Sequence, residues 1–151
     1  MLVLGAVLAL AQAEAVAPSR SGVRPPEPTV TVCEAIAVTS REAPKRRGSF
    51  SATKILDLQL GAILRSRIAG EHVLSLKVYT PKGHLYQQID VPFHGSSVAA
   101  TGGRGYQVSA RLPVAGTSIM TSSLYGQWKV APHLDGSPKA CGKTVLFTIT
   151  Q

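Results

Sequence analysis

The segment 124–151, which closes the chain, contains two extended runs at 127–134 and 144–150, separated by a loop with Asp135-Gly136. Two such runs with turn residues between them are typical of a β-hairpin with a long connection. A single hairpin is at best marginally stable in water, so other strands must cover its apolar face. The segment therefore predicts a chain of packed β-strands, in which Trp128 belongs to the core.

A second hairpin is predicted over 72–93. Leu74, Leu76 and Val78 alternate with polar residues along its first strand, and Thr-Pro-Lys-Gly at 80–83 supplies a turn. The return strand is expected to place four apolar side chains on one face: Leu85, Ile89, Val91 and Phe93. Alternation on both sides of a Pro-Gly turn makes this the clearest hairpin in the chain.

Further strands are predicted at 29–39, which is rich in β-branched residues, and at 106–114, which alternates. The interval 50–68 fits both a strand and a helical stripe. We favour a strand through Leu60 and leave 61–70 open between a loop and a short helix. About seven strands with little helix predict an all-β, two-layer antiparallel sandwich rather than a barrel.

The start of the chain has the pattern of a secretory signal peptide. Residues 1–13 form a short apolar run that ends in Ala-Gln-Ala, although no Lys or Arg precedes it. The run is too short to serve as a transmembrane segment, which needs about 20 helical residues. Residues 14–28 are rich in Pro and charge and are expected to be a flexible lead-in. We therefore expect an exported protein, periplasmic or extracellular, with one β-sandwich domain over 29–151.

The chain has two cysteines, Cys33 and Cys141. In an exported protein they are expected to form one disulfide, whereas in a cytosolic protein two free thiols would be expected. The bridge would close a loop of about a hundred residues. For such a loop the chain-entropy model gives about 4–5 kcal/mol of stabilisation, as an upper guide.

The order of motifs over 70–151 carries a resemblance to a known family. A Pro-x-Gly hairpin is followed by a strand, a small-residue crossover, the run Tyr-Gly-x-Trp-x-Val, an Asp-Gly loop and a terminal Phe-Thr-Ile-Thr strand. This order resembles the second half of bacterial extracellular immunoglobulin-like domains. The resemblance implies a binding or scaffold module with no catalytic residues to transfer. The chain departs from antibody domains because its cysteines do not occupy their intersheet disulfide positions.

Basic residues dominate the charge of the chain. Sixteen Lys and Arg against eight Asp and Glu give a net charge of +8, which favours contact with anionic polymers or surfaces. Five of these cations form a candidate anion-binding loop: Arg41, Lys45, Arg46, Arg47 and Lys54. Adjacent cations can bind phosphates or sulfates in a salt-dependent way. The other interpretation, solvated loop charges without a ligand, is favoured at this point.

The sequence lacks the usual motifs of catalysis and cofactor binding. The segment 136–144 approaches a phosphate-binding loop, but five residues rather than four precede Gly-Lys-Thr, and β-rich sequence follows. The four histidines and two cysteines have no metal-ligand spacing, and the acids are scattered singly. We therefore expect no catalytic, cofactor, nucleotide or metal site, and a hydrolase is the least favoured function.

The sequence thus predicts a monomeric, non-catalytic binding or scaffold module that recognises a protein or cell-surface partner through loops or a strand edge. The alternative is a binder of anionic polysaccharide, lipid headgroups or nucleic acid through the basic loop 41–54. A third possibility is a carbohydrate-facing platform of Tyr79 and Tyr86, which flank one turn, with Tyr125 and Trp128. For Trp128, core packing is favoured.

Overall fold

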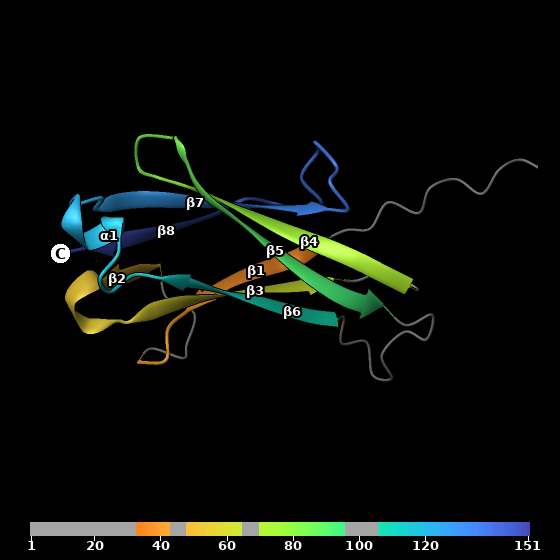
Figure 1. Cartoon of the computed structure of the whole chain (residues 1–151), viewed down its shortest axis with the longest axis horizontal. Coiled ribbons are helices and arrows are strands. Elements are labelled where there is room, and N and C mark those ends of the chain that lie inside the picture. The colour runs from red at the N-terminus through yellow and green to blue at the C-terminus, as the bar shows by residue number, and fades with distance from the viewer. Residues whose placement is uncertain (1–32, 43–47, 65–69, 96–105) are drawn as a thin grey trace, which may run out of the picture.

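The structure is a computed structural model that describes residues 33–42, 48–64, 70–95 and 106–151 (Figure 1). Two β-sheets pack face to face in it, one of three strands and one of five. The predicted signal peptide, the predicted lead-in and the first four residues of the predicted domain lie outside the described residues. Within those ranges no helix is long and apolar enough to cross a membrane.

The elements follow each other mainly as strands. The three-stranded sheet has the order β1–β3–β6 and contains β1 (Cys33–Thr39), β3 (Asp57–Leu64) and β6 (Tyr106–Pro113). The five-stranded sheet has the order β2–β8–β7–β4–β5 and contains β2 (Ser49–Ser51), β4 (Gly70–Tyr79), β5 (Leu85–Gly95), β7 (Gly126–Leu134) and β8 (Val145–Thr150). The described helices are the short 3₁₀ turn η1 (Ala52–Lys54) and α1 (Ser118–Thr121).

The predicted all-β, two-layer sandwich is confirmed. The described part has eight strands where about seven were expected, because β2 adds a short strand that pairs with β8 in parallel. The partition of strands between the sheets is of the immunoglobulin type. β1, β3 and β6 correspond to strands A, B and E of that fold, and β4, β7 and β8 correspond to strands C, F and G.

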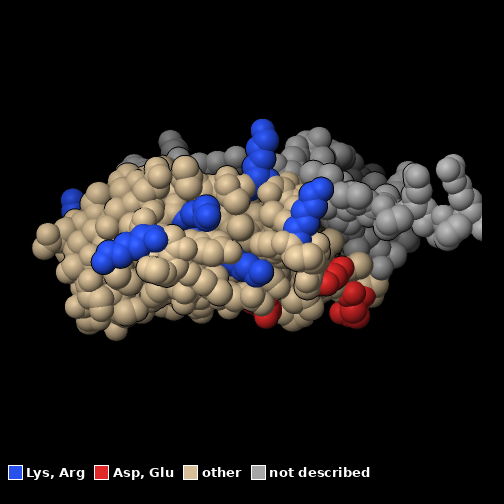
Figure 2. Space-filling model, turned by 90° about the horizontal axis from the view of Figure 1, so that it is seen from above, with Lys and Arg blue, Asp and Glu red and all other residues tan. Residues whose placement is uncertain are grey.

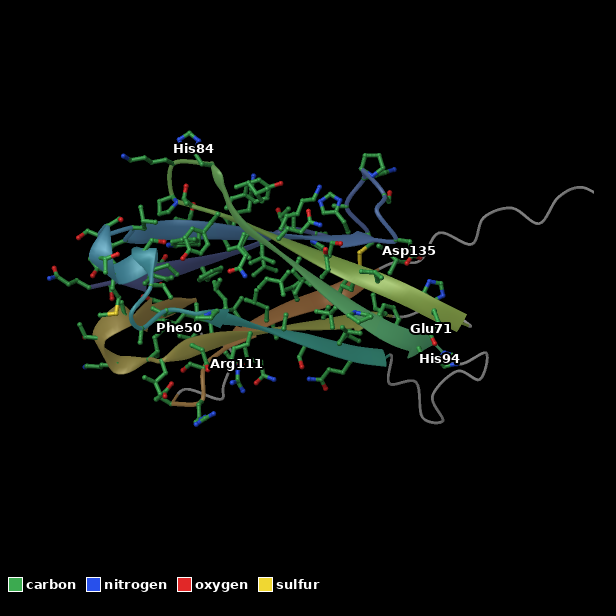
Figure 3. All side chains as sticks on the ribbon, viewed as in Figure 1. Phe50, Glu71, His84, His94, Arg111 and Asp135 are labelled. Atoms are coloured by element: carbon green, nitrogen blue, oxygen red, sulfur yellow. A yellow bond between two sulfur atoms is a disulfide. The ribbon has the colours of Figure 1, made fainter. Side chains whose placement is uncertain are left out.

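The inner faces of the two sheets form one apolar core. Side chains alternate along each strand, so every second residue of β3 and β4 turns inward. Seven of these inward side chains are buried: Leu58, Leu60, Ala62, Leu64, Leu74, Leu76 and Val78. Phe50 of β2 is also buried, and Figure 3 shows it at the end of the sandwich where β2 and α1 lie. Burial of a large apolar side chain contributes about 1.5–3 kcal/mol.

Trp128 is the largest fully buried side chain, as predicted. Its indole Nε1 donates to the carbonyl oxygen of Leu124 at 3.0 Å, so the polar atom of the ring is satisfied inside the core. The ring stacks against Phe147 at 6.4 Å between centroids and makes a T-shaped contact with Tyr86 at 5.2 Å between centroids. Aromatic pairs in these geometries contribute about 0.5–1.5 kcal/mol beyond their buried area.

Leu85 does not take the core position that alternation predicted for it. A β-bulge shifts the register between Val78 and Tyr79, so that Val78 pairs with Gln87 and Tyr79 pairs with Leu85. The added residue, Tyr86, packs against the core, while Leu85 is 54% exposed. The other three predicted residues pack partly buried against the core: Ile89, Val91 and Phe93. An extra residue in one strand makes the side chains beyond it point to the opposite face of the sheet from the one that alternation predicts. The sequence pattern of the strand does not reveal where such a residue lies.

The interval 61–70 is strand at both of its ends. β3 continues past Leu60 to Leu64 and pairs with β1 on one side and β6 on the other. β4 begins at Gly70, and residues 65–69 lie outside the described part. The apolar stripe at 56–64 is therefore not helical, because two neighbouring strands satisfy the extended backbone of β3.

The predicted disulfide Cys33–Cys141 is present and joins residues 108 positions apart. It connects the start of β1 with the loop between β7 and β8, and Cys33 N–H donates to the Cys141 carbonyl oxygen at 2.8 Å. Gly142 lies so close to Cys33 that an added Cβ would overlap the Cys33 carbonyl oxygen. The glycine of the near phosphate-binding motif thus permits a close backbone contact.

We predict that Gly142→Ala lowers the free energy of unfolding by about 1–3 kcal/mol, the usual cost of overpacking. The added methyl group has to push the backbone of Cys33 away from the Cys141–Gly142 segment. Urea denaturation of the oxidised protein measures the effect. Gly48→Ala is the matched control, because no atom lies within 4 Å of its added Cβ. Equal stability of the two variants would contradict this account of the contact.

Candidate functional site

The outer face of the three-stranded sheet carries a polar groove. Residues between the buried positions of β1, β3 and β6 point away from the core, because side chains alternate along a strand. Register places three small residues in one row across the sheet, with Ala37 opposite Gly61 and Gly61 opposite Ser109. These short side chains form the floor of the groove.

Longer polar side chains border this floor. The next row across the sheet joins Thr39, Gln59 and Arg111. On the other side the Nε2 atom of Gln107 lies 3.9 Å from the position that a Cβ on Gly61 would occupy. Two parts of the groove have volumes of about 460 and 310 Å³, and both are lined by Arg41 and Gln59. They therefore adjoin as one groove across the three strands.

Two arginines give one end of the groove its charge. Figure 3 shows Arg111 on the side of the three-stranded sheet that faces away from the other sheet. Its Nε lies 3.3 Å from Asp57 Oδ2, and the Arg111 side chain is 67% exposed. Arg41 lines the same part of the groove, is exposed, and has no acidic partner among the described residues. The terminal nitrogens of both guanidinium groups can therefore meet an incoming anion.

The predicted anion-binding residues divide into three groups. Arg41 lies at the groove, whereas the exposed residue Lys54 is in η1 and does not line it. Lys45, Arg46 and Arg47 lie outside the described residues. Sequence reasoning missed Arg111, which is 70 positions from Arg41 in the chain. The available signal was its outward place in the alternating strand 106–114, but only the register of β3 with β6 brings it beside Asp57.

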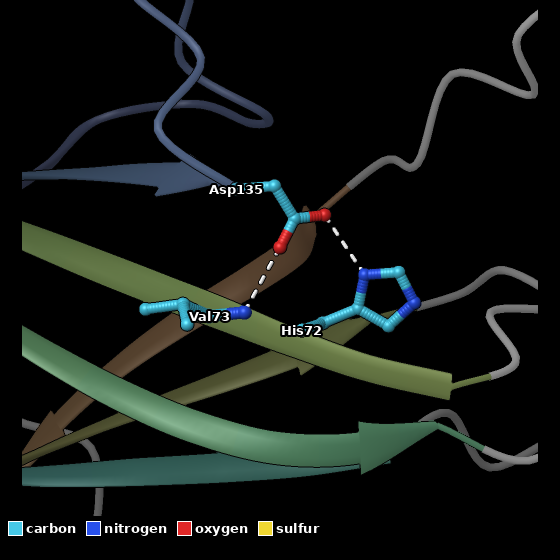
Figure 4. Close-up of polar contacts among 3 residues, drawn as sticks. All are labelled: His72, Val73 and Asp135. Carbon is cyan, nitrogen blue, oxygen red and sulfur yellow. Dashed lines mark hydrogen bonds and ion pairs between the residues drawn. The ribbon is translucent and has the colours of Figure 1, made fainter.

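A polar clasp ties β4 to the end of β7 (Figure 4). Asp135 Oδ1 accepts from Val73 N–H at 2.9 Å, and Asp135 Oδ2 lies 2.8 Å from His72 Nδ1. The Asp135 N–H donates in turn to the Val73 carbonyl oxygen at 2.9 Å. Asp135 has a φ of 49°, a left-handed conformation that Asp tolerates better than most residues. The clasp fixes the turn that follows β7.

Burial raises the pKa of the Asp135 carboxyl, but the Val73 N–H and the His72 side chain outweigh it, so that the pKa lies below its ordinary value of 3.8. A His–Asp pair is also a component of hydrolase triads. Here His72 stacks on Phe93 at 5.7 Å, and the carboxylate is engaged by backbone as well as by the imidazole. This arrangement is that of a structural clasp.

The histidines are spread over the molecule. Figure 3 shows His84 at the β4–β5 turn and His94 at the opposite end of β5, where His94 Nδ1 lies 2.7 Å from Glu71 Oε1. His133 is buried and pairs through Nδ1 with the Ser137 carbonyl oxygen at 2.9 Å. Within the described residues no group of three or more His, Cys, Asp or Glu could hold a metal ion.

The side of the molecule with the five-stranded sheet is also basic, but its cations are spread out. Figure 2 shows Lys and Arg spaced along this side, with Asp and Glu toward one half of it. Lys77 and Lys129 point outward from β4 and β7, and Lys129 Nζ lies 4.6 Å from the centre of the Tyr79 ring. Neither of these lysines lines the groove on the three-stranded sheet.

The open edge of β5 is poorly suited to pairing with another strand. In the described part β5 pairs only with β4. Val73 directs both its N–H and its carbonyl oxygen toward Asp135, so the Val73–Pro92 pair exchanges no hydrogen bonds. Pro92 therefore presents a ring nitrogen without a hydrogen at the open edge. This proline, the charged Asp90 and the bulge at Tyr86 are typical of a protected edge.

The aromatic platform considered from the sequence does not form. Tyr79 and Tyr86 lie on opposite faces of the sheet, because the bulge at Tyr86 intervenes. Tyr79 lies under Lys129 on the outer face, whereas Tyr86 contacts Trp128 inside and accepts from Ser118 Oγ at 3.0 Å. Trp128 is fully buried and unable to stack on a ligand.

Comparisons with known proteins concern the fold. No protein-family model and no curated protein matches the sequence. Among solved structures the chain is similar to an immunoglobulin-like protein from Pseudomonas aeruginosa, with 12% identity, a TM-score of 0.45, and coverage of 80% of this chain and 96% of that chain. It is also similar to part of a proposed beta-galactosidase from Bacteroides fragilis, with 16% identity and a TM-score of 0.42. That match covers 75% of this chain and 15% of the other chain. The strand order given above is immunoglobulin-like.

We predict that Asp135→Asn lowers the free energy of unfolding by about 1 kcal/mol near neutral pH, because the hydrogen bonds to a charged acceptor weaken. The folded-state pKa of Asp135 is depressed, so its stabilisation is present above about pH 4 and is lost as pH falls through the folded value. Denaturant unfolding at about pH 6 and pH 3 measures the difference between wild type and variant, which should shrink in acid.

The control for this prediction is Glu71→Gln, which removes a carboxylate from an exposed His pair. Its effect on stability should be close to zero at about pH 6, since exposed ion pairs contribute about 0–1 kcal/mol. A stability difference between Asp135→Asn and wild type that stays the same at both pH values would contradict the clasp.

Proposed function

We propose that this chain is a non-catalytic, exported binding or scaffold module that recognises a protein or cell-surface partner. The observation that carries the proposal is the polar groove on the outer face of the three-stranded sheet. Most of its lining lies on the strands β1, β3 and β6, which hold binding groups in place better than loops do, whereas Arg41 lies in the bend that follows β1. The proline and the charge at the edge of β5 disfavour strand addition at that edge, so we place the contact surface at the groove rather than at β5.

A specific observation favours partners that carry negative charge. Arg41 and Arg111 line the same part of the groove, and Arg41 has no acidic partner among the described residues. Three further cations follow Arg41 in sequence, at 45–47, and the chain has a net charge of +8. Arginine binds carboxylate, sulfate and phosphate through paired hydrogen bonds. This supports the anionic-polymer function, with Arg111 in addition to Arg41.

We predict that the double variant Arg41→Glu, Arg111→Glu elutes from immobilised heparin at markedly lower salt than wild type. Two attractive contacts become repulsive, and the affinity should fall at least tenfold, or about 1.4 kcal/mol. The matched control is Lys82→Glu, Lys143→Glu, which makes the same change in net charge at exposed positions beside the five-stranded sheet. Salt-gradient chromatography compares the three proteins.

The control separates a site from overall charge. If binding depends on the groove, the arginine variant loses far more retention than the lysine variant. Equal loss in both variants would mean that net charge alone drives binding and would contradict the groove as the contact surface. Circular dichroism of both variants checks that the fold is retained: all four side chains are exposed, but Arg111→Glu also places a second carboxylate beside Asp57.

A further inference from the structure

The groove contains four kinds of polar group. The guanidinium groups of Arg41 and Arg111 stand at one end together with the Asp57 carboxylate, which pairs with Arg111. Side-chain amides of Gln59 and Gln107 lie on the borders, and the remaining polar lining residues carry hydroxyls: Thr39, Ser40 and Ser109. The described residues that line it include no aromatic or large aliphatic side chain. Such a surface offers hydrogen bonds and charge but little apolar area.

This surface suits a polyhydroxylated anion better than a peptide. A bound peptide usually needs apolar pockets or an unpaired strand edge. The groove crosses the face of the three-stranded sheet instead of following one of its edges: its central strand, β3, is paired with β1 and with β6, and among the described residues the unpaired edges of the sheet lie on the far sides of those two strands. Amide and hydroxyl side chains both donate and accept hydrogen bonds, as sugar hydroxyls do, and an arginine fork matches a carboxylate.

Gly61 gives a second, independent indication that something approaches the floor closely. It lies in the interior of β3, and its added Cβ would meet only the Ala37 carbonyl oxygen and Gln107 Nε2, both at 3.9 Å. The fold itself therefore has room for a side chain at this position. Glycine weakens a strand interior, and it often marks a place where a ligand comes close to the backbone.

We infer that the groove binds a short segment of an acidic polysaccharide, whose sugar carboxylates meet Arg41 and Arg111. The sugar hydroxyls pair with Gln59, Gln107 and Ser109, and a sugar ring rests over Gly61. The groove crosses three strands, a width of about 10 Å, which accommodates an oligosaccharide segment. Asp57 is a positioning residue, because it holds Arg111 Nε at 3.3 Å. The inference rests on the proposed function and names the partner class for the same site.

The test is an NMR titration of isotope-labelled protein with a tetrasaccharide of galacturonic acid and with its fully methyl-esterified form. The ester keeps the sugar hydroxyls but removes the negative charge. We expect the acid to shift amide resonances of β1, β3 and β6, and to bind at least about tenfold more tightly than the ester, since charge-assisted bonds are lost in the ester. Equal binding of acid and ester would overturn the inference.

Two variants test the groove itself. Gly61→Val fills the floor without changing charge and should weaken binding of the acid at least about tenfold. The fold should persist, because valine favours strands and the site is free of clashes. Gln127→Val places the same side chain on an exposed outward position of β7 and should leave binding unchanged. Wild-type affinity in Gly61→Val would overturn the inference.

A third probe separates failure of this inference from failure of the proposed function. Poly-glutamate of matched charge carries carboxylates on a peptide and has no sugar hydroxyls. If it shifts the same resonances with equal affinity, and Gln107→Ala has no effect on the tetrasaccharide, the acidic-sugar inference fails while anion binding at the groove stands. If neither polyanion shifts resonances of β1, β3 or β6, the groove proposal fails as well.

Discussion

The packing of two apolar sheet faces against each other is the constraint on which the rest of the structure depends. Trp128 and Phe147 from one sheet and the leucines of β3 from the other are removed from water only when both sheets are present. The Cys33–Cys141 bridge adds a covalent link between the start of β1 and the β7–β8 loop. Once the inner faces are covered, strand alternation leaves polar residues on the outer faces, and the groove lies on one of them.

Local patterns in the sequence predicted most of the fold. Alternation at Leu74, Leu76 and Val78, the buried Trp128 and the Cys33–Cys141 bridge are all as expected. The errors have one physical origin, which is that the pairing between strands is not written in the pattern of either strand alone. The bulge at Tyr86 turned Leu85 outward, and β3 extended through Leu64 because β1 and β6 pair with it. Neither the bulge nor the pairing can be deduced from a single strand.

The candidate site was harder to predict for the same reason. Arg41 was expected to belong to a cluster of neighbours in sequence, whereas in the structure it lines a groove with Arg111. Gly61 fell in the interval that the sequence left open between a loop and a short helix, and its meaning depends on Ala37 and Ser109 in the same row. A net charge of +8 favours contact with an anionic partner, but it does not say where on the molecule that contact lies. Only the register of three strands brings the arginines, the side-chain amides and the open space above Gly61 together at one place.

The central claim is that this groove, rather than the lysine-bearing face of the other sheet, contacts the partner. Covalent footprinting tests it most directly: the protein is modified with an arginine-specific and a lysine-specific reagent, with and without an acidic polysaccharide, and analysed by peptide mass spectrometry. The account predicts protection of Arg41 and Arg111 by the polysaccharide, while Lys77 and Lys129 react as in the free protein. Protection of the two lysines with full reactivity of the two arginines would contradict it.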